Sequence, residues 1–427
     1  MAAMDREELT QAIDQQIESQ RDALIALLQR LVAVPSVTGD EGAVQDAIEP
    51  ELARRGLEVD RWEMTPEEIA PYRWHVGDET RFAGRPNLAG VLKSGGEGRS
   101  ILLNAHVDTV DYGDPDLWTY PPLSGHVAGD LLFGRGSSDM KGGLVSYLGA
   151  LDALAALGVQ LAGDVTVNTT VGEEDGGVGA LSTILRGYRA DAALITEPTR
   201  LALVPAQGGS LVMRLTVPGK SAHGAVRDEG VSAIEKFVPI FQELLAWEAE
   251  RNQSLDHPLY AHLTNKAPFS IGVVRAGTWA STVAESLVAE GRLGLLPGED
   301  VDEFRQAVAD RINGVAREDA WLREHPPSVD WFGGQFAPCE TPVNAPISEA
   351  ILNAHHLVTG KDPDIEGVPY GADMRLFRLL GGMDCVMYGA GDVRVAHHAD
   401  EYISIRELLT ATKTMANLLV IWCGVAE

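Results

Sequence analysis

Cysteine is scarce in this sequence. Its 427 residues include only Cys339, Cys385 and Cys423, which lie far apart and form no Cys-x-x-Cys pair. This scarcity excludes a disulfide scaffold or a cysteine-ligated zinc ribbon and favours a reducing cytoplasm. Long apolar runs are also missing, since no stretch approaches the roughly 20 residues that span a bilayer. The acidic N-terminus has no apolar segment typical of a secretory signal. We therefore expect a cytoplasmic protein with no membrane partner.

Basic residues are few relative to acidic ones. Lys and Arg total 34 against 62 Asp and Glu, which gives a formal net charge of −28. The negative electrostatic field of such a charge repels nucleic acid and anionic membranes, so we expect neither as a partner. Most of the acids serve solubility, but the excess also tolerates bound cations.

The length and the order of the elements indicate two domains, because 427 residues exceed what one core organises. Over residues 1–208 and again over 334–427, apolar strand patterns alternate with helical ones, as in an α/β sheet whose site lies at the strand ends. Between them, residues 209–333 read β-α-β-β-α-β, the order of a ferredoxin-like unit. We interpret this segment as an inserted second domain. Within the first part of the catalytic domain, the sequence predicts one helix over residues 5–33 and a loop over residues 111–129.

One glycine-rich turn, residues 134–143, leads into an apolar helix predicted over 143–157 and contains a single aspartate, Asp139. Glycines permit positive φ and the close approach of other groups. Taken alone, Asp139 is as well explained as a cap of the following helix.

Other candidate residues follow predicted strands. In His106-Val107-Asp108 the first and third residues share a face, so Asp108 can orient the imidazole of His106. Glu173 and Glu174 follow a β-branched strand, and two adjacent carboxylates there suit one metal ligand and one proton carrier. The alternatives are a polar strand end and a solvated acidic loop.

Three further candidates lie in loops. Glu197 precedes Pro198 at the end of another predicted strand, and His397 and His398 lie near the C-terminus. Each is unremarkable alone, because acids before proline and loop histidines are common. With one histidine of the 397–398 pair, Asp139 and the residues at the other strand ends, the set comprises two imidazoles and three carboxylates, with one more acid for protons. That is the ligand set of a paired zinc or cobalt site.

With this set of motifs the sequence resembles the di-zinc amidohydrolases and peptidases that include acetylornithine deacetylase, succinyl-diaminopimelate desuccinylase, aminoacylase and glutamate carboxypeptidase. The resemblance covers nearly the whole chain. It implies a zinc-aminopeptidase-like, three-layer αβα catalytic domain with an inserted ferredoxin-like lid and dimerisation domain. It also implies two Zn²⁺ or Co²⁺ ions per subunit, bridged by Asp139 and a water or hydroxide.

The ligand assignment follows from the resemblance residue by residue. His106, Asp139 and Glu197 would hold one metal. Asp139, Glu174 and His397 would hold the other, since the family's His-x-x-Asp/Asn-Glu motif selects His397 over His398. Asp108 would orient His106, and Glu173 would be the general base and acid. The family also often has a cis peptide after the bridging aspartate, here Asp139–Met140.

The inserted domain contains further residues that the resemblance singles out. His223, in Ser-Ala-His-Gly-Ala, matches a histidine that stabilises the oxyanion and reaches a partner subunit, which implies a homodimer through the lid. Arg292 could bind a substrate carboxylate, or be an ordinary surface arginine. Ser281 stands where related lids have asparagine, and Gly371 lies in the family's Gly-Thr-x-Asp region; both are candidate substrate-binding residues.

The expected function is removal of an acyl group from an N-acylated amino acid or small amine, by attack of metal-bound hydroxide with Glu173 as base. The acetylornithine deacetylase branch is the most similar one, and it includes a deformylase of an N-formyl aminopyrimidine. The alternatives are that deformylase activity, a dipeptidase or exopeptidase with the same centre, and a non-catalytic binding member of the fold.

Overall fold

The computed structural model describes residues 6–77, 79 and 81–426. The N-terminal residues 1–5, part of the stretch that shows no secretory signal, lie outside the described residues. The chain divides into two compact units: unit 1 comprises residues 1–205, 340–366 and 372–427, and unit 2 comprises residues 206–339 and 367–371. Unit 2 is longer at both ends than the insertion placed at 209–333. Residues 367–371 belong to unit 2, whereas the sequence had placed them in the second part of the catalytic domain.

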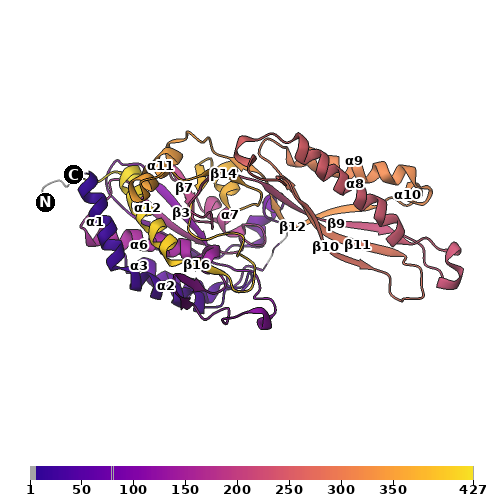
Figure 1. Cartoon of the computed structure of the whole chain (residues 1–427), viewed down its shortest axis with the longest axis horizontal. Helices are drawn as coiled ribbons and strands as arrows, with labels where there is room; N and C mark the ends of the chain where they lie inside the picture. Colours follow the sequence, from indigo (N-terminus) through magenta and orange to yellow (C-terminus); the bar gives the residue numbers. More distant parts are fainter. Residues whose placement is uncertain (1–5, 78, 80, 427) are drawn as a thin grey trace. The chain divides into compact units, whose positions relative to one another are not determined.

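Unit 1 is built on a large mixed sheet whose central strands are parallel (Figure 1). The neighbouring strands β6, β3 and β7 are fully buried, and their sequences are mostly apolar or β-branched, as is typical of strands covered on both faces. The strand order is β1-β2-β6-β3-β7-β15-β8-β13, with β14 beside β8. The bounds are β1 Glu58–Trp62, β2 Asn87–Leu92, β3 Ile101–His106, β6 Val165–Thr170, β7 Ala192–Ile195, β8 Leu203–Gln207, β13 Cys339–Glu340, β14 Ile365–Val368 and β15 Asp384–Met387.

Helices cover both faces of this sheet, so the expected three-layer α/β fold is confirmed. Adjacent strand residues point to opposite faces. The Asn87 side chain donates to Gly179 O in α7, whereas a Cβ on Gly90 would meet Leu52 in α3. One face therefore carries α7, and the other carries α3 with its neighbours. The helices are α1 Arg6–Ser19, α2 Arg21–Ala33, α3 Gly42–Ala53, α4 Pro66–Ile69, α5 Arg73–Val76, α6 Gly142–Ala156, α7 Val178–Leu185, α11 Pro346–Thr359 and α12 Ile405–Cys423, with short turns η1 Ala70–Tyr72, η2 Pro115–Leu117, η3 Ser137–Lys141 and η6 Leu376–Leu380.

Several local elements differ from the sequence-based expectation. The helix predicted over 5–33 is two helices, because Gln20 takes φ −91° and ψ 0° and separates α1 from α2. The stretch 111–129, predicted as loop, contains β4 His126–Ala128, which pairs with β5 Leu131–Phe133. A third strand, β16 Tyr402–Ser404, pairs with β5 from about 270 residues away in the sequence, which local patterns cannot indicate.

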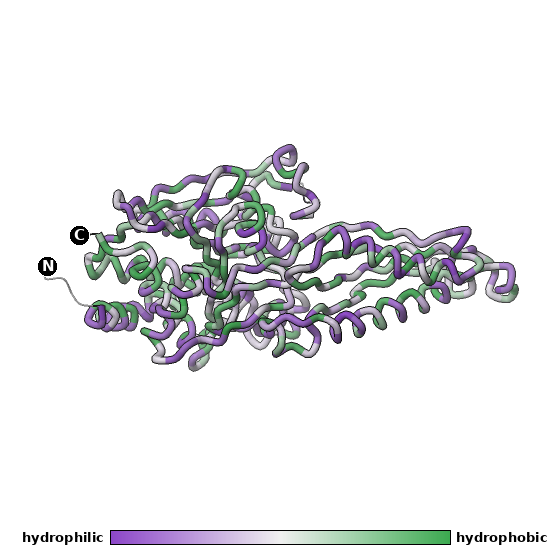
Figure 2. Tube along the Cα trace, turned by 90° about the horizontal axis from the view of Figure 1, so that it is seen from above, coloured by the Kyte–Doolittle hydropathy of each residue, from purple (hydrophilic) through white to green (hydrophobic). Residues whose placement is uncertain are grey.

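Unit 2 has the predicted order β9-α8-β10-β11-α9-β12 around an antiparallel sheet of order β10-β11-β9-β12. Alternate residues of β9 are buried, and they pack with one face of α8 and α9 in a single apolar core. Figure 2 shows purple and green alternating along these helices, as expected when only one face is buried. The elements are β9 Gly209–Pro218, β10 Phe269–Ala276, β11 Ser286–Leu295, β12 Ser328–Phe336, α8 Ala233–Ser254, α9 Val301–Glu318 and α10 Ala320–Glu324, with η4 Gly224–Glu229 and η5 Pro258–Tyr260.

Two of the sequence's absences have structural counterparts. Among the described residues, no helix combines the length and the hydropathy needed to cross a membrane. All three cysteines are buried, and none of them forms a disulfide within the part of the chain that the structure describes.

Candidate metal centre

The candidate residues of unit 1 converge because three parallel strands end at one edge of the sheet. His106 is the last residue of β3, Glu173 and Glu174 follow β6, and Glu197 follows β7. His106 lies opposite Thr170 of β6, and β3 also pairs with β7 in parallel. The carboxyl ends of adjacent parallel strands are where ligands bind in such sheets.

Asp139 reaches this edge from the irregular turn η3, which precedes α6. Gly136 adopts φ +80°, a left-handed conformation that a side chain disfavours. A Cβ on Gly143 would lie 2.2 Å from Thr196 Oγ1, so only glycine lets α6 begin so close to the end of β7. The Asp139–Met140 peptide is cis, as the resemblance implied.

Two groups of donor atoms form here, and they share Asp139. In the first, His106 Nε2 lies 3.0 Å from Asp139 Oδ1 and 3.9 Å from Glu197 Oε1. In the second, His397 Nε2 lies 3.0 Å from Glu174 Oε2 and 3.5 Å from Asp139 Oδ2. Within each group the donor atoms all lie within 4.8 Å of one another.

His397 and its neighbour play different parts. His397 adopts φ +61° in the loop after β15, and its half-exposed side chain points to the second group. His398 belongs to neither group; its backbone carbonyl accepts a hydrogen bond from Arg135.

The electrostatics of the site are those of crowded buried acids. Burial raises the pKa of Glu173 and of Glu197 well above the usual range, and neighbouring carboxylates add to the effect. Burial lowers the pKa of His106, but a hydrogen bond to Asp139 and the charge of Glu197 outweigh it and raise this pKa well above normal. Hydrogen bonds to Asp139 and Glu174 raise the pKa of His397 to about 10. The cluster thus favours bound positive charge.

The donor set fits two divalent cations. Imidazole nitrogen and carboxylate oxygen are the ligands of catalytic zinc sites, and each group offers three residues, which leaves positions for water or substrate. Glu173 Oε1 is buried and has no hydrogen-bond partner among the described residues, although it lies in the same acidic cluster. A buried acceptor without a partner is costly and calls for an explanation, of which a role in the chemistry is one.

Asp108 is placed differently from the expectation. The nearest acceptor to His106 Nδ1 is the backbone carbonyl of Asp108, at 3.0 Å, whereas the carboxylate Oδ1 is 3.6 Å away. The carboxylate instead accepts hydrogen bonds from the backbone N–H groups of Glu173 and Glu174, both at 3.1 Å. Asp108 therefore fixes the turn after β6 as much as it orients the imidazole.

Sequence reasoning missed some of the residues that hold these turns. Buried Glu401 accepts from Ser138 N and Asp139 N at 3.0 and 3.1 Å, and from Arg135 Nη1 at 2.8 Å. Glu401 ends the histidine motif quoted above, which was a usable signal. Asp373 lies in the same acidic cluster, and burial raises its pKa to about 6. It belongs to the Gly-Thr-x-Asp region quoted above, but the motif alone did not predict a function for it.

The remaining candidates lie in unit 2. His223 is exposed, and its Nδ1 accepts from Ala225 N at 3.1 Å. Arg292 is partly buried, and it donates to Ser210 Oγ at 2.9 Å and to Pro369 O at 3.4 Å. Gly371 approaches Phe336 so closely that a Cβ would lie 2.4 Å from the phenylalanine Cβ.

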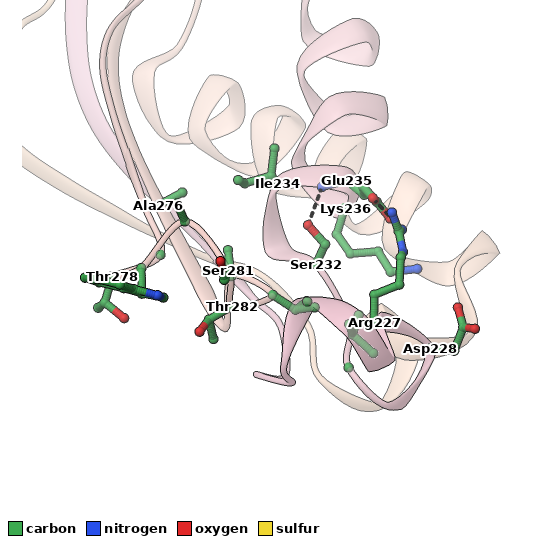
Figure 3. Close-up of a pocket in the computed structure, with 18 residues that line it drawn as sticks. Arg227, Asp228, Ser232, Ile234, Glu235, Lys236, Ala276, Thr278, Ser281 and Thr282 are labelled. Carbon is green, nitrogen blue, oxygen red and sulfur yellow. Dashed lines mark hydrogen bonds and ion pairs between the residues drawn. The ribbon is translucent and has the colours of Figure 1, made fainter.

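Ser281 lines a hollow of about 850 Å³ in unit 2. Figure 3 shows Ala276, Thr278 and Ser281 on one side of it and Arg227 and Glu235 on the other. The hollow lies in unit 2, whereas the two donor groups belong to unit 1.

A mixed α/β sheet with two imidazoles and a carboxylate cluster at the carboxyl ends of its parallel central strands defines a candidate two-metal hydrolase. Residues 102–420 match the model of peptidase family M20/M25/M40. Because that match covers most of the chain, the chain belongs to this family, and the predicted family and hydrolase class are confirmed.

Individual relatives are similar at modest identity. An N-formyl-4-amino-5-aminomethyl-2-methylpyrimidine deformylase of Bacillus subtilis is 27% identical and covers 97% of both chains. A probable succinyl-diaminopimelate desuccinylase of Staphylococcus aureus is 28% identical over 72% of this chain and 80% of its own. Among solved structures, the di-peptidase Dug1p of Saccharomyces cerevisiae superposes with a TM-score of 0.78 at 16% identity, covering 98% of this chain and 99% of its own.

Proposed function

We propose that this protein is a metal-dependent amidohydrolase that removes a short acyl group from a small amine. The main support for this proposal is the pair of donor groups that share Asp139. Among the described residues, the ion pairs of Asp139, Glu174 and Glu197 are with histidines and not with lysine or arginine, so their acidic oxygens remain available to cations. We propose Zn²⁺, with Co²⁺ as the second choice, because mixed histidine and carboxylate ligands suit both.

The roles of the residues follow from their positions. We assign His106, Asp139 and Glu197 to one ion and Asp139, Glu174 and His397 to the other, with Asp139 as the bridge. Two divalent cations held there would polarise the acyl oxygen and lower the pKa of a bound water. Glu173, with its unpartnered Oε1, would accept the proton of the attacking water and deliver it to the departing amine. His223 is the proposed donor to the oxyanion.

The first substrate candidate is an N-formyl aminomethylpyrimidine. The support is that the deformylase relative named above matches along nearly the whole of both chains, whereas the desuccinylase relative matches a shorter part. Arg292 favours a second candidate, an N-acyl amino acid. Among the described residues no acidic side chain pairs with its guanidinium, which could therefore bind a substrate carboxylate.

Metal content and hydrolysis should be measured together, on N-formyl aminopyrimidine, N-acetyl and N-succinyl amino acids and dipeptides. The proposal expects about two ions per chain, and loss of activity on chelation that zinc or cobalt restores. An Arg292→Met variant separates the substrates. It should lose turnover of carboxylate-bearing substrates and leave the formyl pyrimidine unaffected. Fewer than two ions with no amidase activity would instead support a non-catalytic binding protein.

We also propose that the protein is a cytoplasmic homodimer formed through unit 2. Exposed apolar side chains of Ile234, Val238 and Leu245 form a stripe on α8, and a stripe of this kind can be self-complementary about a two-fold axis. Light scattering should give twice the monomer mass, and Val238→Asp should halve it. Leu185→Asp, at an exposed apolar residue of unit 1, is the matched control.

A further inference from the structure

The turn that bears the two adjacent glutamates, residues 172–177, is closed by its own backbone. Gly177 N donates to Gly172 O at 2.7 Å, and Gly176 N donates to Glu173 O at 3.0 Å. At its start, the N–H groups of Glu173 and Glu174 bind the carboxylate of Asp108. These contacts shape the turn and tie its beginning to the end of β3, and Gly179 N, at the start of α7, donates to Val171 O at 3.0 Å. A further anchor reaches the far end of the turn from outside.

That anchor is the guanidinium of Arg375, which is almost completely buried. Its Nη2 donates to Gly176 O at 2.6 Å and to His75 O at 3.1 Å, and its Nη1 donates to Ala372 O at 2.7 Å. The three acceptors come from segments that are distant in the sequence: α5, the glutamate turn and the residues before η6. A planar guanidinium can serve several carbonyls at fixed angles, which an ammonium group does poorly.

The packing around the anchor leaves little freedom. A Cβ on Gly176 would lie 2.0 Å from Val76 O, so α5 presses directly against the turn. A Cβ on Gly177 would lie 2.4 Å from Asp373 Oδ1 and 3.3 Å from Arg375 Nη2. The turn is thus enclosed between residues 75–76 and 373–375. Gly176 and Gly177 lie where these residues approach the backbone of the turn too closely for a side chain.

We propose that Arg375 is a positioning residue for Glu173 and Glu174: it holds the far end of their turn while Asp108 holds the near end. The inference rests on the proposed function, in which these two carboxylates serve as base and ligand. A guanidinium that donates to three carbonyls fixes the positions of all three, which an apolar side chain cannot do. The reaction requires the glutamates to stay within fractions of an ångström of their places, and these contacts would supply that order.

The test compares Arg375→Met with Arg378→Met in full-length protein. Arg378 is the control, because it also links neighbouring elements, donating to Glu340 O at 3.1 Å and Asp384 Oδ1 at 3.0 Å, but does not contact the glutamate turn. We expect Arg375→Met to lower kcat by about 100-fold with KM nearly unchanged, as small displacements of reacting groups do. Arg378→Met should leave kcat within a few-fold of wild type.

A second readout does not depend on activity. In metal-free protein, amides of residues 172–177 should exchange with deuterium at least tenfold faster in Arg375→Met and at the wild-type rate in Arg378→Met. Binding of the second equivalent of Zn²⁺ should weaken about tenfold in Arg375→Met alone. If Arg375→Met does not fold, Arg375→Lys takes its place.

The outcomes separate the two proposals. Unchanged exchange in the Arg375 variant, or equal acceleration in both variants, would overturn the positioning role. A wild-type protein that hydrolyses no acyl amide would overturn the proposed function, yet the exchange experiment would still decide whether Arg375 holds the turn.

Discussion

Substitution of Glu173 by glutamine should lower activity and raise stability at the same time. Glu173 is buried beside Asp373, Glu197 and Glu174, and its Oε1 has no hydrogen-bond partner among the described residues. Glutamine has nearly the same shape but no charge, and it cannot act as a base at neutral pH. The change therefore removes the proposed chemistry while it removes an unfavourable interaction from the fold.

The magnitudes can be worked from the surroundings. A buried carboxylate costs several kcal/mol in desolvation, and no hydrogen bond at Oε1 offsets it. The amide that replaces it still lacks a partner, at a cost of about 1–3 kcal/mol. We expect a net gain of about 1–3 kcal/mol in the free energy of unfolding of the metal-free protein. Loss of a general base should lower kcat by about 10²–10⁴-fold, which is about 3–5 kcal/mol of transition-state stabilisation.

Denaturant unfolding in a chelator and turnover with saturating zinc measure the two effects. Glu174→Gln is the control: burial and the charge of Asp139 raise the pKa of Glu174, but its contact with His397 at 3.0 Å offsets part of this effect, so removal of its charge should raise stability by less than at Glu173. A Glu173→Gln enzyme within tenfold of wild-type kcat would refute the assigned role. A metal-free Glu173→Gln protein less stable than wild type would refute the idea that the fold holds this carboxylate at a cost.

Three further predictions concern stability. Glu401→Gln should cost about 3–5 kcal/mol in denaturant unfolding, because it leaves the buried guanidinium of Arg135 without its carboxylate; a loss below 1 kcal/mol would contradict this. Burial lowers the pKa of His355 from 6.5, so the unfolded chain binds its proton more tightly. The free energy of unfolding should therefore fall as pH drops below about 6.5, and His355→Gln should flatten that slope. Gly177→Ala should lower Tm clearly more than Gly187→Ala, since both have positive φ but only Gly177 faces occupied space; equal shifts would show that the enclosure is not tight.

The positions of the candidate ligands were predictable because the ends of buried strands can be recognised in the sequence. The buried strands before His106, Glu173 and Glu197 are short apolar or β-branched runs, and parallel strands bring such ends to one edge. The βαββαβ order of unit 2 was readable for the same reason, since β9 alternates buried and exposed residues along its whole length.

The groups that hold the turns were not predictable, because their partners are distant in sequence. Arg375 contacts residues 75 and 176, and Glu401 contacts residues 138 and 139; no local periodicity encodes these pairs. That residues 367–371 belong to unit 2 could not be predicted for a similar reason, since tertiary contacts define this assignment.

The buried arginines around the site share one property that explains how an acidic centre can be built. Arg135 pairs with Glu401, Arg85 pairs with Glu41, and Arg375 binds carbonyls. Among the described residues, no lysine or arginine forms an ion pair with Asp139, Glu173, Glu174 or Glu197. An arginine bound directly to one of these carboxylates would neutralise it and compete with a cation. Acting instead on the backbone of the turns, or on acids one step removed, the arginines set the geometry and leave the acidic oxygens free. The order of the site and its affinity for cations are therefore supplied by different residues, which is why removal of Arg375 should disturb the geometry without changing the charge of the ligand set.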